Sequence, residues 1–275
     1  MFNPELRMTT ACLTLDRPEA GLAVLRLTRA SRMNAMDVPA MRELSRTLDQ
    51  LATDRSVRVL VLTGEGRGFC AGLDLKSVLD EQGRYGLNAT ESYELQMVFD
   101  GVMRRLREMD AAVIAAVNGT ALGAGFAMSL CADVRFASRT ASFHVGAVKV
   151  GLSAGECGIS YHLPRLIGAG RAFELMLTGR PVLPEEAERI GLVAGITEPE
   201  ALMERALACA RQILANSPYS TLHTKRVMWS NLDAPSLASA LDLENHVQVL
   251  ALMTEDFGEA ALAFSEKRAP QWRGV

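Results

Sequence analysis

The chain has 275 residues, of which 49% are hydrophobic and 22% are charged, so it can bury a large core and fits one domain, or one domain with a helical appendage. The formal net charge of -3 excludes a general electrostatic attraction to nucleic acid or to an anionic membrane surface. The five cysteines are widely spaced and contain no Cys-x-x-Cys pair, which argues against a disulfide framework and against a zinc site. We therefore expect no metal and a reducing, cytoplasmic setting.

The first ten residues, MFNPELRMTT, lack a basic segment followed by an apolar core, as a secretory signal would have. No apolar run approaches the roughly 20 residues that a membrane-spanning helix needs. We expect a soluble, unprocessed protein without membrane or nucleic-acid partners.

The first half of the chain alternates strand and helix patterns. ACLTLD and GLAVLRLT, separated by a turn with Pro18 and Gly21, predict a β-hairpin. Residues 36–54 place apolar side chains at helical spacing after a capping aspartate, so they predict a helix. VRVLVLTGEG and AAVIAAVNG are apolar runs that end in glycine, typical of parallel strands buried on both faces. Residues 91–110, between these runs, predict a long amphipathic helix.

Strand patterns continue through DVRFAS and ASFHVGAV and fade after about residue 155, where helical patterns dominate. The sequence therefore predicts an α/β fold with a helical C-terminal part. We place the α/β core at residues 1–195 and the helical region at residues 196–275.

Two glycine-rich bends follow predicted parallel strands. RGFCAGLDLKSV covers residues 67–78, and VNGTALGAGFAMSLCAD covers residues 117–133. Ligands of open α/β sheets bind beyond the carboxyl ends of the strands, so both bends can face one cleft. If each points one N–H at the same spot, the pair forms an oxyanion hole, worth roughly 3 to 4 kcal/mol per donor. Neither bend has the glycine order of a P-loop or a dinucleotide-binding turn.

Several motifs together resemble the crotonase superfamily, the enoyl-CoA hydratase/isomerase family. They are RMNAMD, VRVLVLTGEGRGFCAGLDLK, AAVNGTALGAGFAMSLCADVRFAS, VGLSAGECG, LMLTGRPVLPEEAERIGLV and FSEKRAPQW. The resemblance implies a crotonase-like spiral of ββα units and an acyl-CoA thioester substrate, with coenzyme A as part of the substrate and no separate cofactor. It also implies a homotrimer or hexamer, with trimerisation through residues 196–275.

The resemblance also implies site residues. The oxyanion hole would use the backbone N–H groups of Leu73 and Ala124. The adenine of coenzyme A would lie along Ala71 and Asp74. Three further residues match positions that contact the tail or phosphates of coenzyme A: Arg32, Phe264 and Lys267.

The two glutamates of the family's hydratases are missing, because Ala127 and Ala147 stand at their positions. An alanine cannot act as a general acid or base, so hydration by the usual mechanism is not expected. The match that remains is Glu156, whose local sequence resembles that of 3,2-enoyl-CoA isomerases with a single catalytic glutamate. We therefore expect isomerisation of 3-enoyl-CoA to 2-enoyl-CoA with Glu156 as the base.

Alternatives stay open at this point. Glu156 is also placed to cap the helix expected from residue 157, and His144 could face the pocket. A nucleophilic Cys70 or Cys157 is conceivable, although buried, inert cysteines are more common. Other crotonase chemistry on an acyl-CoA thioester, including atypical hydration or hydrolysis, and non-catalytic binding of acyl-CoA also remain.

Overall fold

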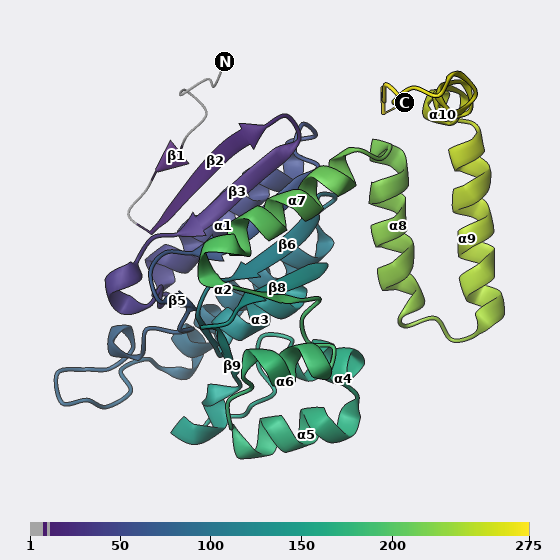
Figure 1. Ribbon diagram of the computed structural model, residues 1–275. Helices are drawn as coiled ribbons and strands as arrows, with labels where there is room; N and C mark the ends of the chain where they lie inside the picture. The colour runs from purple at the N-terminus through teal and green to yellow at the C-terminus, as the bar shows by residue number, and fades with distance from the viewer. Residues whose placement is uncertain (1–7, 10–11, 275) are drawn as a thin grey trace.

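The computed structural model describes residues 8–9 and 12–274 and shows an α/β core from which a helical arm extends (Figure 1). The main sheet has the strand order β1-β2-β3-β4-β6-β8-β10. β1, β2 and β3 pair antiparallel, and the strands from β3 to β10 pair parallel. Its strands are β1 (Met8–Thr9), β2 (Leu13–Glu19), β3 (Leu22–Leu27), β4 (Val59–Gly64), β6 (Ala112–Val117), β8 (Val134–Ser138) and β10 (Ile196–Thr197).

A second sheet of three short parallel strands lies beside the first. Its order is β5-β7-β9, formed by β5 (Gly68–Cys70), β7 (Thr120–Leu122) and β9 (Ser142–His144). Each of these strands follows one strand of the main sheet and precedes a helix, namely α2 (Ala89–Glu108), α3 (Ala124–Cys131) or α4 (Ile159–Ile167). The repeated ββα order confirms the predicted fold class.

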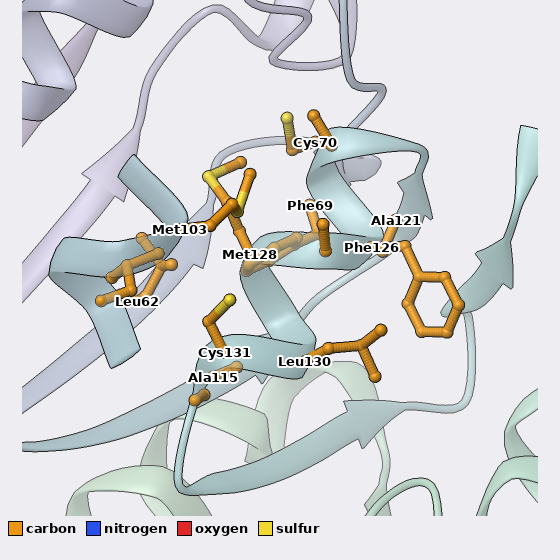
Figure 2. Close-up of a cluster of buried hydrophobic side chains, with 14 of the residues drawn as sticks. Leu62, Phe69, Cys70, Met103, Ala115, Ala121, Phe126, Met128, Leu130 and Cys131 are labelled. Atoms are coloured by element: carbon orange, nitrogen blue, oxygen red, sulfur yellow. The ribbon is translucent and has the colours of Figure 1, made fainter. Parts of the chain in front are cut away.

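The strands of the main sheet are buried on both faces, as their apolar runs predict. Val59 and Val61 of β4 pack in the same cluster as Leu202 and Ala206 of α7 (Leu202–Leu214). The alternate side chains of β4 pack in the larger cluster that includes α1 (Val38–Thr53), α2 and α3. Figure 2 shows the centre of this cluster, where α3 side chains lie among residues of β5 and α2. Helix α3 is therefore held by packing on all sides, and its first turn is a rigid part of the core.

The hairpin prediction is confirmed, but its turn lies later than expected. β2 continues through Pro18 to Glu19, which pairs with Leu22, and the register shifts between Asp16 and Glu19. An irregular stretch of this kind tolerates a proline because the ladder is already interrupted there.

The C-terminal part contains α5 (Ala169–Thr178), α6 (Pro184–Arg189), α7, α8 (Pro218–Asn231), α9 (Leu237–Leu252) and α10 (Glu255–Glu266). β10 pairs with β8, and α7 covers the main sheet, so residues 196–214 belong to the core although they follow the expected boundary at residue 195. The helices that extend away from the core are α8, α9 and α10 (Figure 1), called the arm below. None of the described helices is long and apolar enough to cross a membrane.

Candidate active site

The first bend, residues 71–74, pairs with the segment that precedes α1. The N–H of Met36 donates to the carbonyl of Gly72 at 2.8 Å, and the N–H of Asp74 donates to the carbonyl of Met36 at 2.9 Å. Leu73 lies opposite Met36 in this parallel bridge. Because N–H groups alternate in direction along an extended segment, the N–H of Leu73 points away from Met36.

Asn34 fixes the start of the first bend. Its side chain is fully buried, and Nδ2 donates to the carbonyls of Glu65, Gly68 and Phe69 at 3.0, 2.8 and 3.2 Å. Its backbone is left-handed, with φ of 56°, a conformation that asparagine tolerates better than most residues. Sequence reasoning used this residue only as part of a motif, and the signal that could have singled it out is this tolerance.

The two bends touch each other. Gly72 has φ of +78°, and a Cβ added there would lie 2.6 Å from the carbonyl oxygen of Leu122 and 3.3 Å from the nitrogen of Ala124. The residue before Leu73 therefore packs against the backbone of the second bend. Only glycine permits this approach together with this φ. The structure thus brings the chain around both predicted N–H donors, Leu73 and Ala124, into contact.

Ala124 is the first residue of α3, so its N–H belongs to the first turn, where N–H groups lack partners within the helix. Among the described residues, the non-glycine residues with left-handed φ are Met33, Asn34, Cys157 and Lys267. Ala124 therefore keeps an ordinary backbone conformation, which an alanine adopts without strain.

Glu156 lies against the second bend. Gly123 has φ of +53°, and a Cβ added there would meet Oε1 of Glu156 at 3.3 Å. The N–H of Gly123 donates to the carbonyl of His144 at 3.0 Å, which fixes the bend to β9. A carboxylate oxygen of Glu156 thus lies against the backbone next to Ala124.

The environment of Glu156 suits proton transfer better than helix capping. Its side chain is half-buried, and burial raises the pKa of the carboxyl above its ordinary value. Helix α4 starts at Ile159 with Gly158 as its cap, and within the described chain no side chain caps it. The capping alternative for Glu156 is therefore wrong. A raised pKa is typical of groups that exchange protons near neutral pH.

The positions of the missing glutamates are apolar and closed. Ala127 is 0% exposed and Ala147 is 6% exposed.

Burial raises the pKa of the Cys70 thiol and that of Cys157 to about 12, so neither forms the thiolate that a nucleophile requires. Burial lowers the pKa of His144, and its Nε2 lies 2.9 Å from Oγ of Ser142. Glu156 is thus a carboxyl group with a raised pKa that lies against the second bend.

The residues expected to contact coenzyme A fall into two groups. Arg32, Ala71 and Asp74 lie together at the first bend, where Arg32 Nη1 and Asp74 Oδ2 form an ion pair at 2.7 Å. Phe264 and Lys267 lie in and directly after α10, and Figure 1 shows this helix well apart from α3 and α4. Within one chain the structure does not bring the two groups together. Across the described residues, no group of three or more His, Cys, Asp or Glu is arranged to hold a metal ion.

Comparison with known proteins shows the family to which the chain belongs. A family model described as enoyl-CoA hydratase/isomerase matches residues 17–275. The chain therefore belongs to the enoyl-CoA hydratase/isomerase family, whose members act on acyl-CoA thioesters, and its ββα spiral is the crotonase fold.

Similar proteins carry both hydratase and isomerase names. The chain is 42% identical over 272 residues to a probable enoyl-CoA hydratase of Mycobacterium bovis, covering 96% of this chain and 93% of that protein. A crystal structure of a probable enoyl-CoA hydratase/isomerase from Mycobacterium abscessus has 40% identity and a TM-score of 0.88, over 96% of this chain and 99% of that one. The structure of a monofunctional enoyl-CoA isomerase from M. smegmatis has 41% identity and a TM-score of 0.71, over 84% of this chain and 99% of that one.

Proposed function

We propose that this protein isomerises 3-enoyl-CoA to 2-enoyl-CoA with Glu156 as its single acid–base group. The observation that carries this proposal is the position of the Glu156 carboxylate against Gly123, one residue before the Ala124 donor. A base at this point can reach the carbon next to a thioester carbonyl that is bound by the bends. The isomerase name of the similar M. smegmatis structure also supports the reaction type.

The reaction needs one carboxylate in two roles. Ionised Glu156 removes a proton from Cα of the 3-enoyl thioester, and the electron pair of that C–H bond moves into the carbonyl to give a dienolate. The carboxylic acid formed on Glu156 then returns the proton to Cγ, and the double bond ends between Cα and Cβ. The raised pKa of Glu156 serves both steps, because the carboxylate is a stronger base and the acid persists long enough to protonate Cγ.

The N–H groups of Leu73 and Ala124 would stabilise the dienolate oxygen. Leu73 directs its N–H away from the strand pairing with Met36, and Ala124 offers a first-turn N–H of α3. Fixed backbone donors require little rearrangement as charge develops, and each is worth roughly 3 to 4 kcal/mol.

Hydration is the second candidate, favoured by the hydratase names of several similar proteins. It requires a positioned and activated water molecule as well as a proton donor at Cα. The closed, apolar Ala127 and Ala147 provide neither in the usual way. The proposed preference for isomerisation over hydration therefore follows from the alanines at positions 127 and 147 as well as from the presence of Glu156.

Assembly would complete the coenzyme A site. Helix α9 carries large apolar side chains exposed to solvent in the single chain, among them Leu237 at 74% and Val249 at 60%. Such a surface is typical of a subunit interface. In the proposed trimer or hexamer, the arm of one copy brings Phe264 and Lys267 to the coenzyme A bound at the first bend of another.

A cytoplasmic, reducing setting suits the free thiols of Cys70, Cys131, Cys157 and Cys209.

The test is to compare the wild type with Glu156→Gln on a 3-enoyl-CoA. Glutamine keeps the size of the side chain and removes its acid–base function, so kcat should fall by about a thousandfold or more. The Kd for a saturated acyl-CoA should stay within about threefold, because Glu156 is not proposed to bind the thioester. Retention of at least half of kcat in Glu156→Gln would reject the mechanism.

A further inference from the structure

We propose that Asp233, two residues beyond the end of α8, is a positioning residue for Glu156, because it holds α4 in the place that presents the carboxylate to the second bend. The inference rests on the proposed function for its catalytic consequence. Its structural part concerns three connected contacts: α8 with the core, Asp233 with α4, and α4 with Glu156.

The end of α8 is fixed to the core by a buried ion pair. Lys225 Nζ lies 2.9 Å from Asp133 Oδ2, with the lysine side chain only 8% exposed, and it also donates to the carbonyl of Ala111 at 2.7 Å. One turn later, Nε1 of Trp229 donates to Oδ1 of Asp133 at 2.6 Å. A salt bridge with both oxygens of the carboxylate in use defines one geometry. Asp233, two residues beyond the end of α8, therefore has a fixed position relative to the core.

Asp233 uses that position to bind two residues of α4. Arg165 Nη2 lies 2.7 Å from Asp233 Oδ1, and its Nε donates to the same oxygen at 3.2 Å. The hydroxyl of Tyr161 donates to the other oxygen, Oδ2. The guanidinium of Arg165 also stacks on the Tyr161 ring, 3.6 Å from its centroid. The side chains of Arg165 and Tyr161 thus bind the same carboxylate and also contact each other. This fixes their positions more closely than an isolated surface ion pair would.

Helix α4 is joined to Glu156 by its own first turn. The N–H of Ile159 donates to the carbonyl of Glu156 at 2.8 Å, and the N–H groups of Tyr161 and His162 donate to the carbonyl of Gly158 at 3.1 and 2.9 Å. Tyr161 is therefore part of the same hydrogen-bonded turn as the residues that follow Glu156. A shift of α4 moves the backbone that carries the carboxylate.

Cys157, between Glu156 and Gly158, has an unfavourable backbone conformation, so the turn that carries Glu156 has to be held in place by its surroundings. It has φ of 48°, a left-handed conformation that a cysteine keeps only when its surroundings hold it. Gly158 is also left-handed, with φ of 80°. Two such residues in succession form a sharp turn whose direction depends on the anchorage of α4. The contacts of Asp233 supply that anchorage on the exposed side of the helix.

The experiment compares Asp233→Ala and Tyr161→Phe with Asp110→Asn in the full-length protein. Asp110 and Arg226 form another Asp–Arg pair between the core and α8, at 2.5 Å, but it does not involve α4. Since a displacement of about 1 Å at a reacting group can cost up to about a hundredfold in rate, we expect kcat on 3-enoyl-CoA to fall about tenfold in Asp233→Ala. Tyr161→Phe should lose about threefold, KM should change less than about twofold in both, and Asp110→Asn should match the wild type.

A second readout does not depend on activity. Amide hydrogen exchange of residues 151–160 should be about tenfold faster in Asp233→Ala than in the wild type and unchanged in Asp110→Asn. Unchanged exchange in Asp233→Ala would overturn the inference whatever the substrate. Equal losses of kcat in Asp110→Asn and Asp233→Ala would also overturn it. If the wild type fails to isomerise 3-enoyl-CoA, the proposed function fails, and the exchange result still decides whether Asp233 holds the turn.

Discussion

Glu156 and Gly123 meet where the second bend enters α3: Oε1 of the glutamate lies 3.3 Å from the point that a Cβ on the glycine would occupy. The two residues belong to separate ββα units, β7–α3 and the segment before α4. Their contact places a carboxylate oxygen of Glu156 against the second bend, one residue before Ala124. A substitution of Gly123 therefore tests the position of the carboxylate, just as a substitution of Glu156 tests its chemistry.

Gly123→Ala should impair catalysis. The added methyl group would press on the Glu156 carboxylate, and the combination of φ at 53° with ψ at -119° would cost an alanine roughly 1 to 3 kcal/mol. We expect kcat to fall at least about tenfold through displacement of the base. Gly170→Ala is the matched control, because a Cβ on Gly170 meets nothing within 4 Å. Unchanged kcat in Gly123→Ala would show that the carboxylate acts elsewhere or not at all.

The rate should depend on the ionisation of Glu156. Burial raises the pKa of this carboxyl above the ordinary value of 4.5, and the first step needs the ionised form. In the free enzyme, kcat/KM should therefore rise with pH through a midpoint above 4.5. A profile of kcat/KM against pH with an acidic midpoint at or below that value would contradict the assignment.

The same shift has a consequence for stability. A carboxyl whose pKa is raised by folding favours the folded state at low pH, and this contribution is lost as pH rises from the unfolded value through the folded pKa. Glu156→Gln should therefore increase the free energy of unfolding relative to the wild type at about pH 8, and the gain should shrink towards about pH 4. Urea unfolding at both pH values measures the difference, and a gain that grows towards acid would have the wrong sign.

Asn34→Ala should destabilise the protein and disturb the first bend. It removes two buried hydrogen bonds to the carbonyls of Gly68 and Phe69 and a partly buried one to Glu65, and unsatisfied buried groups make the expected loss about 3 kcal/mol. Asn88→Ala, which removes the exposed cap of α2, should cost only about 1 kcal/mol. The two variants are compared by urea unfolding, and equal losses would show that Asn34 does not organise the bend.

Substitutions of two neighbouring residues of α8, Lys225 and Arg226, should lower the free energy of unfolding by very different amounts. Lys225 is paired with Asp133 and 8% exposed, whereas Arg226 is paired with Asp110 and 56% exposed. Lys225→Met leaves a partly buried carboxylate without its cation and should lower the free energy of unfolding by about 3 kcal/mol. Arg226→Met should cost less than about 1 kcal/mol. A small effect of Lys225→Met would mean that α8 does not depend on this ion pair.

Much of the fold follows from local patterns. The buried runs that form β4 and β6 and the capped helix α1 need only hydrophobic periodicity and end signals, and the glycine bends follow from their place after the strands. β10 was not expected, because two residues, Ile196 and Thr197, carry no periodicity. The position of Pro18 inside β2 depends on an irregular pairing that the sequence does not display.

The site was only partly predictable. Glu156 was selected through a motif resemblance, but its approach to Gly123 depends on how residues 151–158 fold between the 3-10 helix Gly146–Val150 and α4. Contacts between the arm and α4 were not expected, such as that of Asp233 with Tyr161, 72 residues away in sequence. Charged surface residues give no sign of their partners, because their positions are set by helix packing rather than by local pattern.

We propose that one carboxylate, that of Glu156, performs isomerisation without hydration. The most direct measurement supplies the wild type with a 3-enoyl-CoA and, separately, with a 2-enoyl-CoA, and separates the products by chromatography. We expect conversion of the 3-enoyl to the 2-enoyl thioester, with 3-hydroxyacyl-CoA formed at less than about one hundredth of that rate. Formation of 3-hydroxyacyl-CoA from the 2-enoyl substrate as fast as isomerisation, or faster, would contradict it.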